Sequence, residues 1–420
     1  MTAKTDGTNE LMKQHTRPAN PPVAAADHSD LFADRIADVP KSFIREILKA
    51  TISPSVISFA GGLPNRDLFP LEELHAAADK VFVTAGKEAL QYSTSEGYLP
   101  LREYIAARYR DKQGLEIPVD HIMITSGSQQ GLDLLGKTFL NDGDEVIIEE
   151  PGYLGAIQAF SVYKARFNPV PVGDSGMDAE RLRQVANARK NKLFYLVPNF
   201  QNPSGISYSE ENRRAVAAVM AGTRTLLIED DPYGDLRFSG TRPISFKKLL
   251  PDQTILLGSF SKTVAPGFRL GWIVAPKPIM EKLVIAKQAS DLHTNYFCQR
   301  VVSQYLADHE LDRHIARITA AYGTQCEAMR QAIREFFPTG IAATAPAGGM
   351  FLWATLPERL SSMALFELAV KDDVVFVPGN PFYVNRQDTN TLRLNFSCVD
   401  PATIRTGIER LGRAIRVLMG

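Results

Sequence analysis

The chain has 420 residues, of which 45% are hydrophobic and 22% charged, a composition typical of globular proteins. This length exceeds what one small core needs, so we expect a large and a small domain. Lysine plus arginine equals aspartate plus glutamate, at 47 each, and this balance disfavours a nucleic-acid-binding protein, which normally carries a basic surface.

The N-terminal residues 1–30 are rich in Thr, Ala, Asn and Pro without periodicity, and we expect a disordered tail. This tail lacks the apolar core of a secretory signal and is too short for a DNA-binding domain. Residues 42–49 predict a short helix with a serine cap and one apolar face. Residues 56–60 predict a strand that runs into a sharp loop at Gly61 and Gly62.

Between residues 66 and 280, short apolar runs typical of strands alternate with stretches of helical length. Strands are expected at residues 122–125, 145–148, 193–197, 225–228, 254–258 and 271–274, with helices at 129–140 and 209–220 among those between them. Apolar strands that alternate with helices indicate a mostly parallel sheet covered on both faces. Ligands bind at the carboxyl ends of such strands, so functional side chains should directly follow the strands.

The C-terminal part of the chain predicts a smaller α+β domain after a long helical stretch at 296–336. Its strands are expected at 349–353 and 391–396, and its helices at 365–371 and 402–418. No apolar run reaches the ~20 residues that span a bilayer, so we expect a cytoplasmic protein that contacts neither membrane nor nucleic acid. The predicted organisation is a disordered tail at 1–30, an arm at 31–65 that joins the small domain, a large domain at 66–300 and the small domain at 301–420.

The three cysteines, Cys298, Cys326 and Cys398, form no C-x-x-C pair and lie in no Cys/His cluster with metal-ligand spacing. A sparse, odd number of cysteines suits a reducing compartment, and free cysteines usually pack as small apolar residues. We therefore interpret all three as packing residues and expect no bound metal.

The most informative stretch is 259–272, which follows an apolar strand. An ammonium group at a strand end is unfavourable without a partner, and an aldehyde is such a partner because lysine condenses with it to an imine. Lys262 is therefore expected to bind pyridoxal 5'-phosphate (PLP). Ser259, Ser261 and Arg269 supply the hydroxyl donors and the cationic fork that suit a phosphate. A solvated loop lysine is the alternative, and the complete stretch disfavours it.

A second anion-binding feature is expected where the strand at 122–125 meets the helix that begins near Ser128. The first turn of a helix offers free backbone N–H groups and a positive dipole end. Taken alone, Ser128 is an ordinary helix cap. Together with Ser259, Ser261 and Arg269 it predicts a phosphate site.

Two neighbouring carboxylates, Asp230 and Asp231, follow another apolar strand. PLP catalysis needs a carboxylate that keeps the pyridine nitrogen protonated, so that the ring withdraws electrons from the substrate Cα. We choose Asp230 because it follows the strand directly, whereas Asp231 precedes a proline and is expected to turn outward. A turn-forming Asp pair is the alternative.

Four further side chains near strand ends or in the C-terminal strand can complete such a site. The amide of Asn202 and the hydroxyl of Tyr233 can donate to the ring hydroxylate of the cofactor, and Tyr153 can stack on the ring. Arg393 alternates with two leucines in its strand and can clamp an α-carboxylate with two hydrogen bonds. Each of them, taken alone, is an ordinary loop, packing or surface residue.

With these stretches in place, residues 35–418 resemble the class I/II aminotransferases of the fold-type I PLP enzymes, above all the 2-aminoadipate and kynurenine aminotransferases. The stretches that carry the resemblance are Ser42-Phe-Ile-Arg-Glu-Ile-Leu, Phe59-Ala-Gly-Gly-Leu-Pro, Leu90-Gln-Tyr-Ser with Glu96-Gly-Tyr, Ser126-Gly-Ser-Gln-Gln, Asn202-Pro-Ser-Gly, Glu229-Asp-Asp-Pro-Tyr, 259–272 and Leu392-Arg-Leu. The resemblance implies an α/β fold: a large PLP-binding domain with a mostly parallel seven-stranded sheet between helices, plus a smaller α+β domain.

The resemblance also implies roles for individual residues. Lys262, Asp230 and Tyr233 are catalytic, and Lys262 also moves the proton. The cofactor-binding residues are Ser128, Gln129, Tyr153, Asn202, Asp230, Tyr233, Ser259, Ser261, Lys262 and Arg269, with Tyr92 reaching the phosphate of the other subunit in a homodimer with shared active sites. Arg393, Asn202, Gly61 and Gly62 bind the substrate, and Arg45 meets acidic substrate side chains and swings away for apolar ones.

The expected function is that of a transaminase. The amino group of an L-amino acid (2-aminoadipate, glutamate, aromatic or branched-chain) is expected to pass to a 2-oxo acid, with 2-oxoglutarate as the expected acceptor, in two half-reactions. A PLP-dependent β-lyase or decarboxylase stays open as an alternative, because it shares Lys262 and Asp230. A non-catalytic PLP-binding regulator is disfavoured by the neutral charge and the short tail.

Overall fold

The computed structural model describes residues 28–37, 39, 55–188, 190–386 and 388–420. Residues 28–37 belong to a first unit, Met1–Asp38, and the other described residues belong to a second unit, Val39–Gly420. The first unit contains the 3-10 turn η1 (Ser29–Leu31) and the short helix α1 (Asp34–Ala37), which buries none of its side chains. Most of the expected tail and the expected helix at 42–49 lie outside the described residues.

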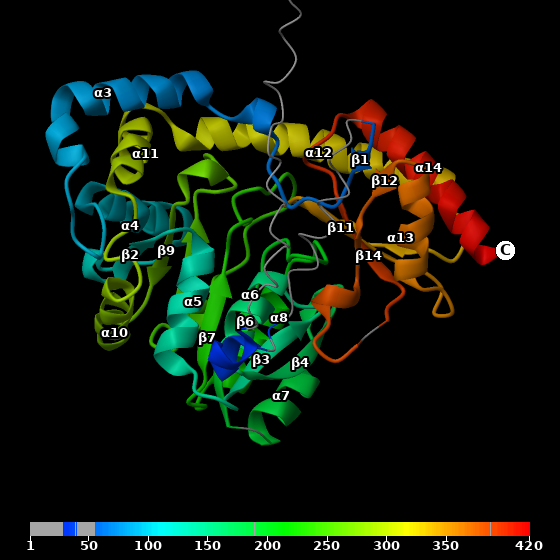
Figure 1. The fold of residues 1–420 in the computed structure, drawn as a ribbon, viewed down its shortest axis with the longest axis horizontal. Coiled ribbons are helices and arrows are strands. Elements are labelled where there is room, and N and C mark those ends of the chain that lie inside the picture. Colours follow the sequence, from blue (N-terminus) through cyan, green and yellow to red (C-terminus); the bar gives the residue numbers. More distant parts are fainter. Residues whose placement is uncertain (1–27, 38, 40–54, 189, 387) are drawn as a thin grey trace, which may run out of the picture. The chain divides into compact units, whose positions relative to one another are not determined.

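A mixed, mostly parallel sheet forms the centre of the second unit (Figure 1). Its strand order is β2-β9-β8-β7-β6-β3-β4-β5. The strands are β2 (Ile122–Thr125), β3 (Glu145–Glu150), β4 (Arg166–Gly173), β5 (Gly176–Met177), β6 (Asn191–Leu196), β7 (Leu226–Asp230), β8 (Thr254–Ser259) and β9 (Gly271–Val274). All neighbouring pairs from β8 to β4 are parallel, whereas β9 runs antiparallel to both β8 and β2.

The expected number of seven strands is wrong by one, because the two-residue strand β5 turns back antiparallel on β4. Our list of expected strands also missed β4 itself. This strand contains Pro169 and Pro171 and buries only Val170 completely, so it shows no apolar run. Prolines are tolerated towards the margin of a sheet, where fewer N–H groups are needed for pairing.

Helices cover both faces of this sheet. They are α3 (Leu71–Ala89), α4 (Leu99–Gln113), α5 (Ser128–Phe139), α6 (Leu154–Ser161), α7 (Ala179–Ala188), α8 (Glu210–Met220), α9 (Phe246–Leu249), α10 (Lys277–Gln288) and α11 (Tyr296–Asp308), with 3-10 turns η2 (Arg66–Leu68), η3 (Val119–His121) and η4 (Pro266–Phe268). Val146 and Ile148 of β3 pack in one apolar cluster with residues of α5 and α6. Ile147 packs in another cluster with residues of α7 and α8. Since side chains alternate along a strand, the two clusters lie on opposite faces.

The long helical stretch expected at 296–336 is divided in the structure. Helix α11 ends at Asp308, and α12 (Leu311–Phe336) begins three residues later. His309 and Glu310, between them, have extended backbone angles. Neither residue is a strong helix breaker, so helix propensity gives no signal for this break.

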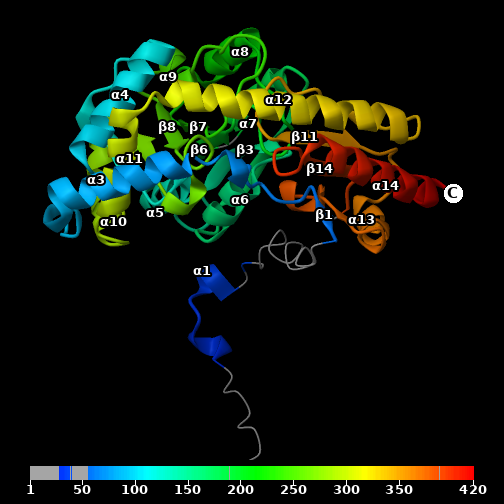
Figure 2. The ribbon, with the colours of Figure 1, turned by 90° about the horizontal axis from the view of Figure 1, so that it is seen from above.

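The C-terminal part contains a small antiparallel sheet with the order β10-β11-β14-β13. Its elements are β10 (Ala342–Ala343), β11 (Phe351–Thr355), β13 (Val377–Pro378) and β14 (Thr391–Asn395), with α13 (Ser362–Lys371), α14 (Pro401–Met419) and η5 (Asn380–Phe382) beside them. The strand β1 (Ile57–Ser58) pairs in parallel with β12 (Val374–Val375). Figures 1 and 2 show α12 running from the side of α11 towards the small sheet, where it packs along α14. Among the described helices, none is long and apolar enough to cross a membrane.

Candidate active site

A cavity of about 420 Å³ lies at the carboxyl ends of the parallel strands. Its walls include Gly62, Ser128, Gln129, Tyr153, Asn202, Asp230, Tyr233, Ser259, Ser261, Lys262, Arg269 and Arg393, all of which the sequence singled out. The sheet topology explains this convergence. The strands β2, β3, β6, β7 and β8 share one direction, so the segments that follow them meet at one edge of the sheet.

Lys262 follows β8 and extends into the cavity. Its Nζ donates to the backbone oxygen of Gly62 at 2.7 Å, and no described carboxylate forms an ion pair with it. Desolvation by the cavity walls lowers the pKa of Lys262 to about 8, and the positive charges of Arg393 and Arg269 act in the same direction. A neutral, nucleophilic amine is therefore accessible near neutral pH.

Asp230 ends β7 and is almost completely buried in the cavity wall. Its Oδ2 accepts a hydrogen bond from the Tyr195 hydroxyl at 2.7 Å, whereas its buried Oδ1 has no hydrogen-bond partner among the described residues. Burial raises the pKa of Asp230 to about 7. A buried carboxylate oxygen without a partner is costly, so this oxygen is suited to a donor from a bound molecule.

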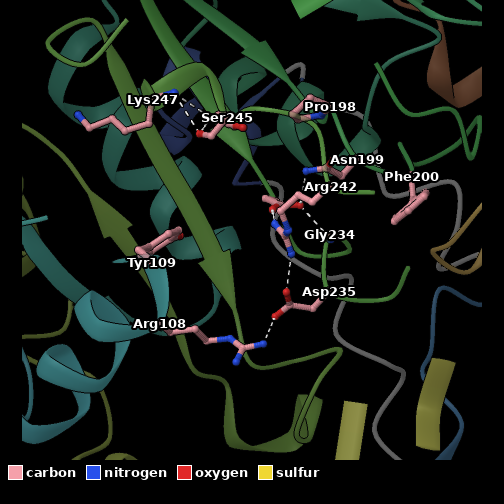
Figure 3. A network of polar contacts seen from close by, with 12 residues as sticks. Arg108, Tyr109, Pro198, Asn199, Phe200, Gly234, Asp235, Arg242, Ser245 and Lys247 are labelled. Atoms are coloured by element: carbon pink, nitrogen blue, oxygen red, sulfur yellow. Dashed lines mark hydrogen bonds and ion pairs between the residues drawn. The ribbon is translucent and has the colours of Figure 1, made fainter. Parts of the chain in front are cut away.

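Asp231, the next residue, points into a network of ion pairs. It accepts hydrogen bonds from the Gly234 amide at 2.9 Å, from the Asn199 side chain at 3.0 Å and from Arg242 at 2.9 Å. Figure 3 shows how Arg242 continues to Asp235, whose other oxygen accepts from Arg108 at 2.7 Å. Asp231 does not line the cavity of Asp230, which agrees with the expectation that it turns away.

The expected phosphate end of the cavity combines a helix start with an arginine. Helix α5 begins at Ser128, and Gly127 before it has a φ of +77°. The positive φ favours glycine at this position, and a terminal nitrogen of Arg269 lies 2.5 Å from where a Cβ of Gly127 would be, so the helix start and the arginine are close together. Ser259 and Ser261 line the same region, and the Gln129 side chain donates to the Gly155 carbonyl at 2.9 Å. Free N–H groups, hydroxyls and a guanidinium together suit a phosphate.

Arg393 lies in β14 of the small sheet and reaches the cavity with a buried guanidinium. One terminal nitrogen donates to Asn202 Oδ1 at 2.7 Å and the other to the Ala60 carbonyl at 2.6 Å, while Nε has no partner in the described part of the chain. Its guanidinium carbon lies 4.5 Å from the centre of the Phe351 ring. Burial lowers the pKa of Arg393 to about 10. A guanidinium with no ion-pair partner among the described carboxylates is ready to bind a carboxylate from outside.

The two tyrosines that the sequence singled out both lie in the cavity wall. The Tyr233 hydroxyl is 3.5 Å from the Asn202 amide nitrogen, so both groups face the same place. Burial raises the pKa of Tyr153 to about 12 and also raises that of Tyr233, so both stay protonated donors at neutral pH.

Two of the expected site residues that the structure describes are not in the cavity wall. Gly61 is buried next to Gly62, but only Gly62 lines the cavity. Tyr92 is 79% exposed on the loop after α3, where its ring meets the edge of His293. Arg45 lies outside the described residues. The expectations for Tyr92 and Arg45 therefore stay predictions.

Tyr195 is a cavity residue that sequence reasoning missed. It lies in the apolar strand β6, where a tyrosine looks like a packing residue. The only signal was a polar side-chain tip in a strand that otherwise ends in apolar residues. Its partner Asp230 belongs to the next strand, and this pairing becomes evident only with the register of the sheet.

Comparisons with known proteins agree with this geometry. The family model for aminotransferase class I and II matches residues 55–411. The chain is 41% identical to aromatic-amino-acid aminotransferase 1 of Thermococcus litoralis, over 93% of this chain and 95% of that protein. It is 40% identical to 2-aminoadipate transaminase of Thermus thermophilus, over 93% and 98% respectively. The crystal structure of Pyrococcus horikoshii kynurenine aminotransferase in complex with PMP superimposes with a TM-score of 0.90 at 41% identity, over 94% and 99%.

The described residues fit the cofactor of this family. They offer an amine without an anionic partner, an unpaired carboxylate oxygen and a helix start that closes on an arginine. These are the groups that an aldehyde, a protonated pyridine nitrogen and a phosphate require. The chain therefore belongs to the class I and II aminotransferases and is a PLP-dependent enzyme of amino acid metabolism.

Proposed function

We propose that the protein transfers the amino group of aromatic L-amino acids and of 2-aminoadipate to 2-oxoglutarate in two half-reactions. The observation that carries this proposal is that Lys262 and the buried Arg393 line the same cavity. Neither side chain has an ion-pair partner among the described residues. An α-amino acid presents a carboxylate and an amino group on one carbon, and these two residues match that pattern.

Each side chain of the cavity has a task in this proposal. PLP, when bound, supplies the electron withdrawal that acidifies the Cα–H bond of the substrate. Arg393 binds the α-carboxylate and thereby directs the Cα hydrogen towards Lys262. The Nζ of Lys262, whose pKa is lowered to about 8, would take the proton from the substrate Cα and deliver it to the C4′ carbon of the cofactor.

The remaining polar groups hold the cofactor in place. Asp230 Oδ1 would accept from the protonated pyridine nitrogen, and Asn202 and Tyr233 would donate to the ring hydroxylate. The start of α5, with Ser259, Ser261 and Arg269, would bind the phosphate. Held in this way, the cofactor would keep one orientation relative to Lys262 and Arg393.

Aromatic donors are supported by the apolar part of the cavity. Leu63, Val197 and Tyr153 line it, and Leu63 is 59% exposed at the loop after Gly62. Such a wall can bury the ring of an aromatic side chain. The names of the relatives support the same donor classes, because one acts on aromatic amino acids and another on 2-aminoadipate.

We also propose a homodimer with shared active sites. The exposed apolar side chains of Leu90 and Tyr92, at 70% and 79%, lie close together after α3 and support a contact between subunits. In the dimer, Tyr92 of the partner subunit would reach the phosphate end of the cavity. The oligomeric state of the Tyr92→Phe variant, measured by sedimentation, and its affinity for PLP test the proposed dimer and the proposed role of Tyr92.

The experiment that tests the reaction is a spectrum of the holoenzyme mixed with single amino donors and no acceptor. Phenylalanine, tyrosine, kynurenine, 2-aminoadipate, glutamate and leucine form the panel. Donors of the proposed classes should convert the absorbance of the bound PLP to that of the amine form, and 2-oxoglutarate should restore it. Release of pyruvate, ammonia or carbon dioxide without an acceptor would instead identify a lyase or decarboxylase. A spectrum that stays unchanged with every donor would contradict the proposal.

A further inference from the structure

We infer that Tyr195 is a positioning residue for the reaction: its hydroxyl occupies one oxygen of Asp230, leaves the other oxygen for the cofactor nitrogen and makes the carboxylate less basic. This inference rests on the proposed function, in which Asp230 is the partner of the pyridine nitrogen.

The geometry of the sheet brings the two residues together. Tyr195 lies on β6 and Asp230 on β7, and these strands are parallel neighbours. The register places Tyr195 beside Ile228, and Asp230 follows two residues later. Since side chains two residues apart share a face of a strand, Tyr195 and Asp230 lie on the same face. Their oxygens are 2.7 Å apart in a buried hydrogen bond.

The two oxygens of Asp230 are therefore not equivalent. Oδ2 is bound by Tyr195, while Oδ1 is buried without a partner in the part of the chain that the structure describes. The bond to Tyr195 prevents the carboxylate from rotating to offer both oxygens to another group. It thus selects Oδ1 as the acceptor for a donor that enters the cavity, and that donor is the pyridine N–H of the cofactor.

The hydroxyl of Tyr195 acts as a permanent donor because its environment keeps it protonated. Burial raises the pKa of Tyr195 well above its ordinary value, and the nearby charges of Asp230 and Glu149 add to this shift. The ring is also held in place: Tyr153 stacks on it at 6.4 Å and Phe160 meets it edge-on at 6.3 Å. A donor that stays protonated at neutral pH and is packed between two rings holds the direction of the carboxylate and lowers its basicity.

Other ionisable groups around Asp230 do not replace this donor. Asp231 raises the pKa of Asp230 by its negative charge, and its own oxygens are engaged by Arg242, Asn199 and Gly234. Tyr195 is the side-chain donor that the described residues provide to Asp230 and the group that opposes the effect of burial.

Removing the hydroxyl should therefore change the electronic state of the cofactor. Without the hydrogen bond, Asp230 becomes more basic and draws the shared proton away from the pyridine nitrogen. The ring then withdraws electrons less strongly. The pKa of the chromophore that bound PLP forms with Lys262 should therefore rise by about one unit. Since one pKa unit corresponds to a factor of ten in the proton equilibrium, kcat should fall about tenfold. The KM for the amino acid should change little, because Arg393 is untouched.

The test compares the Tyr195→Phe and Tyr208→Phe holoenzymes by pH titration of their visible spectra and by single-turnover kinetics. Tyr208 is a matched control: it is equally buried and its hydroxyl donates to Glu149 at 2.7 Å, outside the cavity. We expect the spectral titration and kcat to shift in Tyr195→Phe and to stay unchanged in Tyr208→Phe. Equal shifts in both variants, or none in Tyr195→Phe, would overturn the inference.

A more conservative replacement of Tyr195 keeps the inference testable if Tyr195→Phe fails to fold. Replacement of Tyr195 by 3-fluorotyrosine preserves the ring and the hydroxyl but makes the phenol more acidic, so it donates more strongly. The spectral pKa should then move downward, opposite to the shift of Tyr195→Phe. A residue that only fills space would not produce shifts of opposite sign, and the absence of a downward shift would contradict the inference.

The Asp230→Asn variant, alone and combined with Tyr195→Phe, separates this inference from the proposed function. If Asp230→Asn leaves the spectral titration and the affinity for PLP unchanged, the proposed role of Asp230 is wrong. If Asp230→Asn shifts the titration but Tyr195→Phe does not, only the inference about Tyr195 fails. If the proposed roles of Asp230 and Tyr195 are both correct, Tyr195→Phe should have no further effect in the Asp230→Asn background.

Discussion

Each charged residue of the cavity has a counterpart of the same type in the surrounding scaffold, and the two groups differ in their partners. Among the described residues, Lys262 donates only to the Gly62 carbonyl, whereas Lys287 of α10 donates to Asp291, Gln130 and Thr294. Within the same part of the chain, Asp230 has one unpaired oxygen, whereas Asp231 accepts from three donors.

The arginines repeat this contrast. Every guanidinium nitrogen of Arg213 in α8 donates to an oxygen of the protein, and one of them also lies 3.8 Å from Glu229. Arg393 is just as buried, yet its Nε is unpaired and it forms no ion pair with a described carboxylate. Burial of a charge therefore does not distinguish function from scaffold in this protein. Unsatisfied buried polar atoms also occur outside the cavity, for example on Arg237 and His314. The cavity differs in that its lysine, aspartate and arginine lie together without ion-pair partners among the described residues.

The comparison of the two lysines gives the prediction with the largest effect. Lys262→Ala should lower the single-turnover rate of the donor half-reaction by about 10³-fold or more, since it removes the group that moves the proton. Lys287→Met should keep that rate within a few-fold and instead lower the unfolding temperature, because Asp291 loses its ion-pair partner. Stopped-flow absorbance and thermal unfolding measure both variants. A Lys287→Met enzyme that folds but loses the half-reaction would break the comparison.

Arg393 gives a smaller, substrate-dependent effect. Arg393→Lys keeps the positive charge but loses the planar fork, so kcat/KM for an amino acid should fall by about 10- to 100-fold, as expected for the loss of a bidentate ion pair. An amine donor without a carboxylate serves as the internal control, and its slow rate should not fall further. Equal losses for both donors would show that Arg393 does not bind the carboxylate.

Much of this arrangement was predictable because apolar strands that end in polar residues leave a clear pattern. Asp230 is the last residue of β7, and Lys262 comes three residues after the end of β8. Asp230 lines the cavity, whereas Asp231 does not. The convergence of these strand ends on one edge follows from the parallel topology.

The parts that sequence reasoning missed depend on contacts between distant segments. Tyr195 looks like a packing residue until the register of β6 and β7 places it beside Asp230. The strand β4 carries two prolines and no apolar run, and it is placed by its pairing with β3. No glycine or proline indicates the break between α11 and α12 in the sequence.

A further prediction concerns the scaffold and the pH dependence of its stability. Both oxygens of Glu149 have donors, Tyr208 and the Val197 amide, yet burial raises its pKa to about 8. A carboxyl whose pKa is raised on folding stabilises the folded state at low pH and loses this contribution as the pH rises towards that pKa. Between pH 5 and 8 its stabilising contribution should fall by up to about 1.4 kcal/mol per pH unit.

Urea unfolding of the apoenzyme across this range, compared with Glu149→Gln, isolates the contribution of Glu149. The variant should show a flatter dependence on pH and an unchanged half-reaction once loaded with PLP. A parallel dependence in both proteins would mean that Glu149 is ionised throughout.

The most direct test of the account is the donor half-reaction of Asp230→Asn and Asp231→Asn measured side by side. The two variants carry the same chemical change at adjacent positions, one in the cavity wall and one in the ion-pair network. We predict that Asp230→Asn lowers the single-turnover rate by about 10²- to 10³-fold at nearly unchanged stability, as expected for the loss of a key electrostatic contact. Asp231→Asn should mainly lower the unfolding temperature. Equal losses of rate, or a larger loss for Asp231→Asn, would contradict the account.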